Sequence, residues 1–253
     1  MNKPREQIYY GKKACLALLE NRPDEVIRLY HSAAHRQQLG GVFSWMAAKR
    51  LTYREVDEES LVKIAKSTHH EGIAVAAAPL LYRELNPDAA RRAASGKNLW
   101  LALDGVENPH NLGAIVRSAA FFGVGGVLLG GVDPGSRVNA AVSRVSEGGA
   151  EMVPLYAFNN LADGIGLLKT AGFRAIGLET DVEEPFTKVV ARGECNGPTV
   201  LVLGNEAEGL SRATRTACTR LCVLEGSGEL NSLNVSVTAA VALASVFWSK
   251  NRN

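Results

Sequence analysis

Apolar residues beyond position 98 fall in short continuous runs that alternate with segments of helical spacing. Strands are expected at 99–103, 127–129, 153–156, 175–178, 200–203 and 221–224, and helices near 111–122, 139–147, 160–171, 211–217 and 232–250. Strands that are apolar on both faces are typical of a parallel sheet that helices cover on both sides. The pattern therefore predicts an α/β domain with a mostly parallel sheet over residues 98–253.

The first 79 residues carry a more mixed pattern and are predicted to form a separate small α/β domain. Helices are expected at 11–19, at 34–51 and after the acidic residues 57–59, with strands at 26–30 and 72–77. Residues 80–97 are polar, small and basic, which is typical of a linker between domains.

The last expected helix has an apolar face. Leu233, Val237, Val241 and Trp248 recur at helical spacing, together with Ala240 and Ala244. Such a face is expected to pack on the sheet.

Composition narrows the class of protein. Hydrophobic residues make up 46% and charged residues 21%, as in a soluble globular protein. The apolar stretches are too short to span a bilayer and the N-terminus does not resemble a secretory signal, so a cytoplasmic location without membrane contact is expected. The net charge of +2 permits nucleic-acid binding without requiring it. Four scattered cysteines indicate neither a disulfide framework nor a metal site.

A first candidate block spans residues 104–123 and joins a strand to a helix, where open α/β sheets bind ligands. Asn108-Pro109 interrupts the chain before the helix, and Asn111 is expected to cap it. Arg117 lies in an apolar run that leaves little room on a solvent face. A charged group in such surroundings is expected to be paired or functional.

Two further blocks follow. In residues 200–210 an apolar strand ends at Leu203-Gly204 and is followed by Asn205, Glu206 and Gly209. Glycine there lets backbone approach a ligand closely, but neither a phosphate loop nor a G-x-G-x-x-G motif is present. In residues 232–244, Ser232 and Asn234 stand at the start of a helix, whose free N–H groups favour an anionic ligand atom.

Together the three blocks resemble the motifs of the SpoU/TrmH family within the SPOUT class of methyltransferases. The resemblance covers about residues 98–250, and residues 7–79 resemble the small RNA substrate-binding domain often found ahead of it. It implies a C-terminal trefoil knot, a homodimer with active sites at or near the subunit interface, and S-adenosyl-L-methionine as cofactor. The implied reaction is methylation of a ribose 2′-hydroxyl in rRNA or tRNA.

The resemblance also implies roles for individual residues. The implied catalytic residues are Asn111, Arg117, Glu206, Ser232 and Asn234. The implied cofactor-binding residues are Leu203, Gly204, Asn205, Gly209, Leu224 and Leu233. One segment departs from the family, which usually has Ile-Pro-Met where this chain has Leu224-Glu225-Gly226.

A ribose hydroxyl needs help with its proton before it can attack. In the family that the chain resembles, the arginine that matches Arg117 is commonly assigned as the general base. A guanidinium, however, stays protonated at ordinary pH. Arg117 is therefore predicted to act as a cation that stabilises the developing alkoxide or anchors the adjacent phosphate. The alternatives are an RNA-binding protein that keeps the fold but has lost methyl-donor binding, a methyltransferase for a base nitrogen or a protein, and a small-molecule α/β enzyme.

Overall fold

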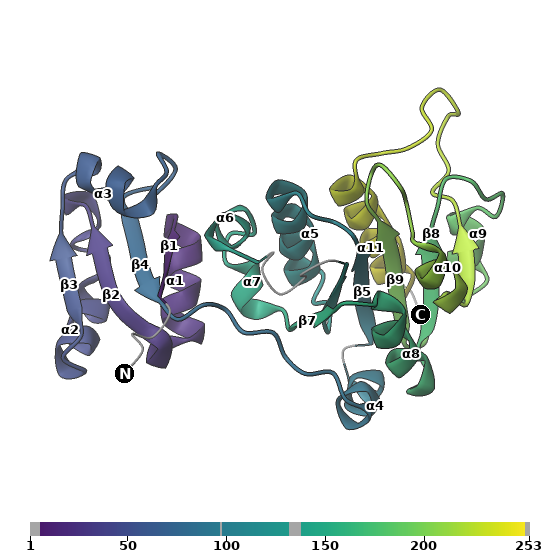
Figure 1. The fold of residues 1–253 in the computed structure, drawn as a ribbon, viewed down its shortest axis with the longest axis horizontal. Helices are drawn as coiled ribbons and strands as arrows, with labels where there is room; N and C mark the ends of the chain where they lie inside the picture. The colour runs from purple at the N-terminus through teal and green to yellow at the C-terminus, as the bar shows by residue number, and fades with distance from the viewer. Residues whose placement is uncertain (1–5, 97, 132–137, 251–253) are drawn as a thin grey trace. The chain divides into compact units, whose positions relative to one another are not determined.

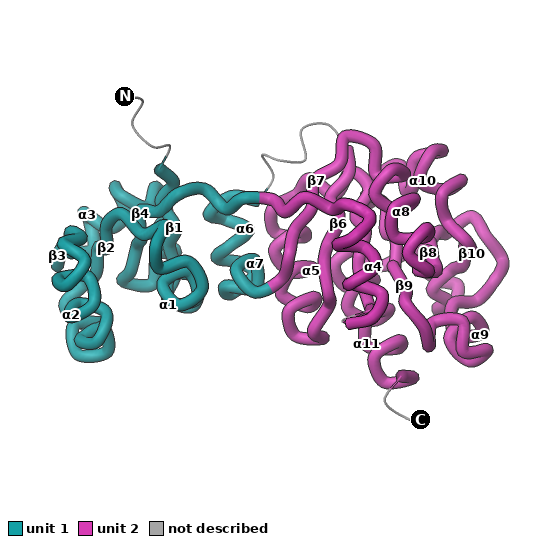
Figure 2. The backbone as a smooth tube through the Cα atoms, turned by 90° about the horizontal axis from the view of Figure 1, so that it is seen from below, with its two compact units in different colours: residues 1–81, 138–152 teal, residues 82–137, 153–253 magenta. Residues whose placement is uncertain are grey.

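The computed structural model describes residues 6–96, 98–131 and 138–250. The chain forms two compact units, one made of residues 1–81 with 138–152 and the other of residues 82–137 with 153–253 (Figure 2). No helix among the described residues has the length and apolar character needed to cross a membrane.

Unit 1 is built on a four-stranded sheet in the order β1-β4-β2-β3 (Figure 1). Strands β2 and β3 pair in parallel, whereas β4 pairs antiparallel with β1 and with β2. The strands are β1 (Gln7–Tyr10), β2 (Val26–His31), β3 (Thr52–Glu55) and β4 (Ile73–Ala77), and the helices of this part are α1 (Lys12–Asn21), α2 (Gly40–Ala48) and α3 (Glu58–Ala65). The short 3-10 turns η1 (Pro23–Glu25) and η2 (Ala33–His35) complete it.

Two short helices from further along the sequence, α6 (Ala140–Val145) and α7 (Gly149–Met152), belong to unit 1. Gly148 between them has a φ of +85°, and a Cβ there would lie 2.4 Å from the Cβ of Ala17 in α1. The Glu151 carboxylate accepts hydrogen bonds from Nε and Nη2 of Arg22, at 2.6 and 3.0 Å. Close backbone packing and a two-bonded ion pair therefore fix this segment to α1.

Unit 2 is an α/β layer structure around a six-stranded sheet in the order β10-β8-β9-β5-β6-β7, in which every pair is parallel. The strands are β5 (Leu99–Asp104), β6 (Val127–Gly130), β7 (Leu155–Phe158), β8 (Arg174–Leu178), β9 (Thr199–Gly204) and β10 (Arg220–Cys222). All six residues of β5 are buried, as expected for a central strand covered on both sides.

Helices cover both faces of this sheet. They are α4 (Pro87–Ser95), α5 (Pro109–Phe121), α8 (Leu161–Thr170), α9 (Phe186–Ala191), α10 (Arg212–Ala217) and α11 (Val235–Lys250). α8 packs with α4 and α10, and its side of the core includes Trp100 and Ala102 of β5. Because side chains alternate along a strand, Leu101 and Leu103 point to the other face, where α11 packs with α5, α9 and β9.

The elements confirm the predicted alternation of strands and helices in unit 2 and its parallel sheet. Three predictions were wrong. The expected helix 34–51 begins only at Gly40, after the turn η2, and residues 80–97 contain helix α4, with Leu85 and Ala90 in the core of unit 2. The apolar face of α11 does not lie on the sheet: Leu233, Val237, Val241 and Trp248 are exposed, and the buried positions are Val235, Ala239, Ala242, Leu243 and Val246.

The division into units also differs from the domain limits expected from the sequence. Residues 138–152 were expected in the C-terminal domain and instead join unit 1, and the first boundary lies after residue 81. Lys97, the end of the expected linker, is outside the described residues.

Candidate active site

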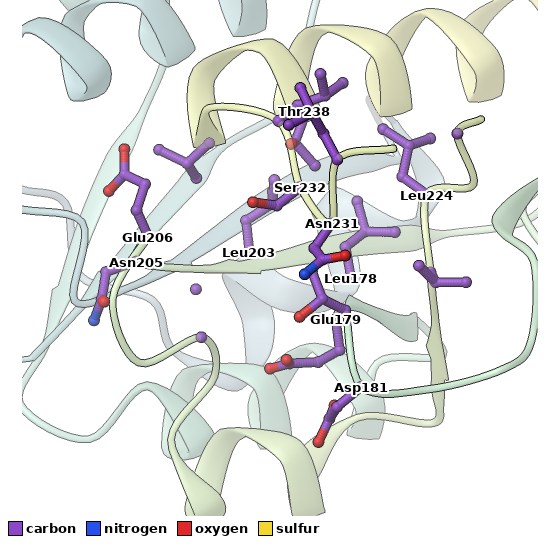
Figure 3. A pocket seen from close by; sticks show the side chains of 18 of the residues that line it. Leu178, Glu179, Asp181, Leu203, Asn205, Glu206, Leu224, Asn231, Ser232 and Thr238 are labelled. Atoms are coloured by element: carbon purple, nitrogen blue, oxygen red, sulfur yellow. The ribbon is translucent and has the colours of Figure 1, made fainter. Parts of the chain in front are cut away.

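A cavity of about 680 Å³ opens at the carboxyl ends of β8, β9 and β10 in unit 2 (Figure 3). Parallel sheets place their ligand sites at this edge. The walls come from the segments that follow β8, β9 and β10 and from the start of α11. The lining includes Leu178, Glu179, Asp181, Leu203–Gly209, Arg215, Val223–Ser227, Glu229–Leu233, Val235, Thr238 and Val241.

Three predicted catalytic residues meet through their side chains. Asn111 Nδ2 donates to the Glu206 carboxylate, and Asn234 Nδ2 donates to Asn111 Oδ1 at 3.1 Å and to Glu206 Oε1 at 3.4 Å. The network therefore joins the first turn of α5, the segment after β9 and the start of α11. Each of the three sequence blocks contributes one member.

Helix capping fixes two of the elements that carry this network. Asn108, not Asn111, caps α5, since its side chain accepts from the N–H of His110 at 2.9 Å. The expectation that Asn111 is the cap was wrong, and its side chain is available to Glu206. Asn234 Oδ1 accepts from the N–H of Ser236 at 2.9 Å, so the same side chain stabilises the start of α11 and donates to the network.

The other two predicted catalytic residues lie elsewhere. Ser232 lines the cavity beside Leu233. The Arg117 side chain is exposed on α5, and its immediate neighbours Ile115, Val116 and Ala119 are buried. The expectation that the apolar run encloses Arg117 was wrong because α5 turns this position away from the sheet.

Backbone packing, not ligand approach, accounts for Gly204. A Cβ at this position would lie 2.1 Å from the carbonyl carbon of Gly209 and 2.6 Å from the nitrogen of Leu210. Gly209 itself has a φ of +66°, which favours glycine. Asn205 Oδ1 accepts from the N–H groups of Ala207 and Glu208 at 2.9 and 2.8 Å. The segment that carries Glu206 is thus a tight turn, held by close backbone packing and by the side chain of Asn205.

Glu179 is a lining residue that the sequence analysis missed. Its carboxylate accepts from the N–H of Leu210 at 2.7 Å and lies 3.6 Å from the guanidinium of Arg215. Its side chain is only 7% exposed, so this charge lies largely out of solvent. The available signal was an acidic residue directly after an apolar strand, at the edge of the sheet where ligands bind.

The segment Leu224-Glu225-Gly226 differs from the family's usual Ile-Pro-Met and places a carboxylate, that of Glu225, in the cavity wall. This carboxylate is hydrogen-bonded. The Glu225 carboxylate accepts hydrogen bonds from Oγ1 and the N–H of Thr187 in α9. Desolvation would raise the pKa of Glu225, but the hydrogen bonds from Thr187 and from the backbone N–H groups of Phe186 and Glu225 together hold the pKa below its usual value.

The lining fits S-adenosylmethionine. Leu178, Leu203 and Leu224 supply apolar wall, which suits an adenine ring, and Glu179 and Asp181 supply negative charge, which suits a sulfonium or ammonium group. Among the described residues no group of three or more potential metal ligands is found. Burial raises the pKa of the thiols of Cys218 and Cys222 to about 12, which disfavours the thiolate that a metal would need.

Comparison with known proteins identifies relatives of both parts of the chain. The SpoU rRNA Methylase family matches residues 98–244, and the family described as RNA 2′-O ribose methyltransferase substrate binding matches residues 8–83. The chain is 36% identical to the 23S rRNA (guanosine-2′-O-)-methyltransferase of Xanthomonas axonopodis, over 94% of this chain and 95% of that protein. The corresponding protein of Pseudomonas aeruginosa is 34% identical over 92% and 93%.

Solved structures share the fold. A crystal structure of an RNA 2′-O ribose methyltransferase matches with a TM-score of 0.77 and 24% identity, over 98% of this chain and 90% of that one. The AdoMet-bound rRNA methyltransferase from Sinorhizobium meliloti matches with a TM-score of 0.73 and 21% identity, over 96% and 87%. The chain therefore belongs to the SpoU rRNA methylase family and is an S-adenosylmethionine-dependent RNA 2′-O-ribose methyltransferase.

Proposed function

We propose that this enzyme methylates the ribose 2′-hydroxyl of a guanosine in 23S rRNA. The observation that carries the assignment of the site is the hydrogen-bonded network of Asn111, Glu206 and Asn234 beside a cavity that fits the donor. The relatives from Xanthomonas axonopodis and Pseudomonas aeruginosa, which align over nearly the whole chain, are named for that reaction.

When bound, the cofactor supplies an activated methyl group, so the protein must align the acceptor and manage its proton. Leu203, Gly204, Asn205, Gly209, Leu224 and Leu233 are the residues proposed to hold the cofactor. Because Gly204 packs on Gly209, we assign it to shaping the turn, with Leu203 and Leu224 as side-chain wall. Ser232 lines the same cavity and is proposed to orient the donor or the ribose.

Glu206 and the two asparagines form the polar side of the proposed acceptor site. The Glu206 carboxylate accepts from both Asn111 and Asn234, so its charge is held by amide donors. A carboxylate fixed in this way keeps both amides in one orientation for an RNA ribose. Arg117 is proposed to act as a cation on the developing alkoxide or the neighbouring phosphate.

We also propose a homodimer, whose interface is the exposed apolar face of α11 with the adjoining part of α5. Val237, Val241 and Trp248 of α11 are exposed, as is Leu233 just before this helix. The side chain of Phe121 in α5 is 82% exposed. Patches of this kind mark protein interfaces. Arg117 is exposed on the same α5, so in the dimer it would lie at or near the interface and the active site.

Two finer properties of the resemblance remain part of the proposal. The C-terminal segment is proposed to form a trefoil knot; in support, the chain returns from the edge strand β10 to α11, which packs on α5, α9 and β9. The enzyme is proposed to act in the cytoplasm, where a bacterial ribosomal RNA would be its substrate.

The decisive experiment is a methylation assay on 23S rRNA that lacks the modification, with labelled donor and mapping of the 2′-O-methyl position. Transfer to one guanosine ribose is expected, together with donor binding by calorimetry. Transfer to a tRNA alone, or to a base nitrogen, would contradict the proposal. Gly204 is unsuitable for a blocking variant, because a side chain there would disturb the turn itself.

A further inference from the structure

Residues 223–226 form a wall of the cavity that is attached to the rest of unit 2 by few backbone hydrogen bonds. Val223 is the last residue of this wall with backbone hydrogen bonds: its N–H donates to the carbonyl of Glu184, and its carbonyl accepts from Phe186, both at 2.8 Å. Over Leu224–Leu233, all within the described part of the chain, no backbone–backbone hydrogen bond is made. The wall must therefore be fixed by other means or remain loose beside the donor.

Glu225 supplies the next attachment. Thr187 donates to the Glu225 carboxylate from Oγ1, and from its N–H at 3.4 Å. Thr187 is the second residue of α9, whose Phe186 and Val189 are completely buried. The attachment point is thus anchored in the core, and Leu224 is bracketed by the backbone bonds of Val223 and the side-chain bonds of Glu225.

The charge of Glu225 is used in this attachment and does not face a cation in the cavity. Arg215 is the one arginine among the described lining residues of the cavity, and it forms ion pairs with Glu179 and Asp181. The distance from Arg215 Nη1 to Asp181 Oδ1 is 3.0 Å. Glu229 also lines the cavity and is exposed, and its carboxylate makes no hydrogen bond or ion pair to any described residue. Two carboxylates of one wall can therefore be compared: one attached to the core and one not.

We propose that Glu225, acting through Thr187, is a positioning residue that holds the Leu224–Gly226 wall in place for the methyl donor. This inference rests on the proposed function, because it assumes that the donor occupies this cavity. It assigns to a carboxylate–threonine link the stiffness that the family's usual proline would give the same segment. Glu225 itself need not contact the donor.

The test is calorimetric titration of the full-length protein with S-adenosylmethionine, for a set of matched variants. Glu225→Ala and Thr187→Val are each expected to weaken binding about tenfold, the scale of a hydrogen bond to a charged group. The double variant should be no weaker than Glu225→Ala alone, because that change already removes the whole link, of which Thr187→Val removes only the hydroxyl bond. Thr187→Ser keeps the hydroxyl donor and should bind like the unaltered protein.

Glu229→Ala separates charge from positioning. It removes one carboxylate from the same cavity and is expected to change donor affinity by less than about twofold. RNA affinity and the unfolding temperature should stay unchanged in all these variants, which a general structural defect would not allow. Equal losses in Glu225→Ala and Glu229→Ala would overturn the inference, as would undiminished binding in Glu225→Ala. If the unaltered, folded protein binds no donor, the proposed function fails instead.

Discussion

At the scale of single residues, the site depends on three side chains that are remote in sequence. Asn111 and Glu206 are 95 positions apart, and Asn111 and Asn234 are 123 apart. Their mutual hydrogen bonds hold the ends of α5, β9 and α11 in one arrangement. Since Asn234 also caps α11, a change in its amide would alter both the helix start and the proposed acceptor site.

Glu206→Ala is expected to lower kcat for RNA methylation about 100-fold, because the two amides lose the charge that orients them. Donor affinity should change by less than about threefold, since the network lies at one side of the cavity. Single-turnover methylation and calorimetry measure the two quantities. Glu183→Ala is the matched control: it removes an exposed carboxylate that lies outside the network and outside the cavity lining, and it should leave kcat unchanged. A similar loss in both variants would contradict the assigned role.

Arg117→Lys is expected to keep a measurable fraction of the activity, and Arg117→Ala to lose nearly all of it, if the residue acts as a cation. The pH–rate profile under single-turnover conditions is the discriminating measurement. Its limbs should not move between arginine and lysine, because neither titrates near neutral pH. An essential base whose apparent pKa follows the residue at 117 would show that residue to be the proton acceptor.

At the scale of elements, helical periodicity located α11 but not the surface that it covers. The spacing of the apolar positions 233, 237, 241 and 248 predicts a face toward the sheet. The helix instead buries the small residues Ala239 and Ala242 there, which allow α11 to approach β9 and α5 closely. A helix with two apolar sides gives no sign in its sequence of which side meets its own domain.

Val237→Glu is expected to disrupt the proposed homodimer, because it places a charge in the exposed apolar face of α11, at a position that does not line the cavity. Sedimentation velocity should show a monomer that is still folded and has little methylation activity. Ser44→Glu adds the same charge at an exposed position of α2 in unit 1 and should leave the assembly unchanged. A Val237→Glu protein that remains dimeric would place the interface elsewhere.

At the scale of the whole molecule, the chain passes between its two units three times, after residues 81, 137 and 152. The sequence predicted two α/β parts and the order of their elements, since these follow from local periodicity. It could not predict that residues 138–152 join unit 1. That placement depends on long-range partners, such as Arg22 with Glu151 and Ala17 with Gly148, which no local pattern reports.

Glu151→Ala is expected to lower the free energy of unfolding by about 2 kcal/mol, because Arg22 would lose its buried two-bonded partner and keep only the more exposed carboxylate of Glu25. The Glu151 side chain is completely buried and that of Arg22 is 11% exposed. Lys13→Ala breaks the exposed pair with Glu147 and should cost less than about 1 kcal/mol. Urea unfolding measures both. Equal small losses would mean that the Arg22–Glu151 pair does not anchor the segment.

The inserted segment 138–152 has a consequence for building chimaeras between relatives of different target choice. If only residues 1–81 were transferred to a relative, Ala17 and Arg22 would meet that relative's own α6–α7 segment. This segment would not have to carry the matching partners, which in this chain are Gly148 and Glu151. Only the transfer of both stretches, 1–81 and 138–152, would move the whole of unit 1. Unit 1 is thus encoded by two separate stretches of the gene, and an exchange of this unit between relatives has to move both of them.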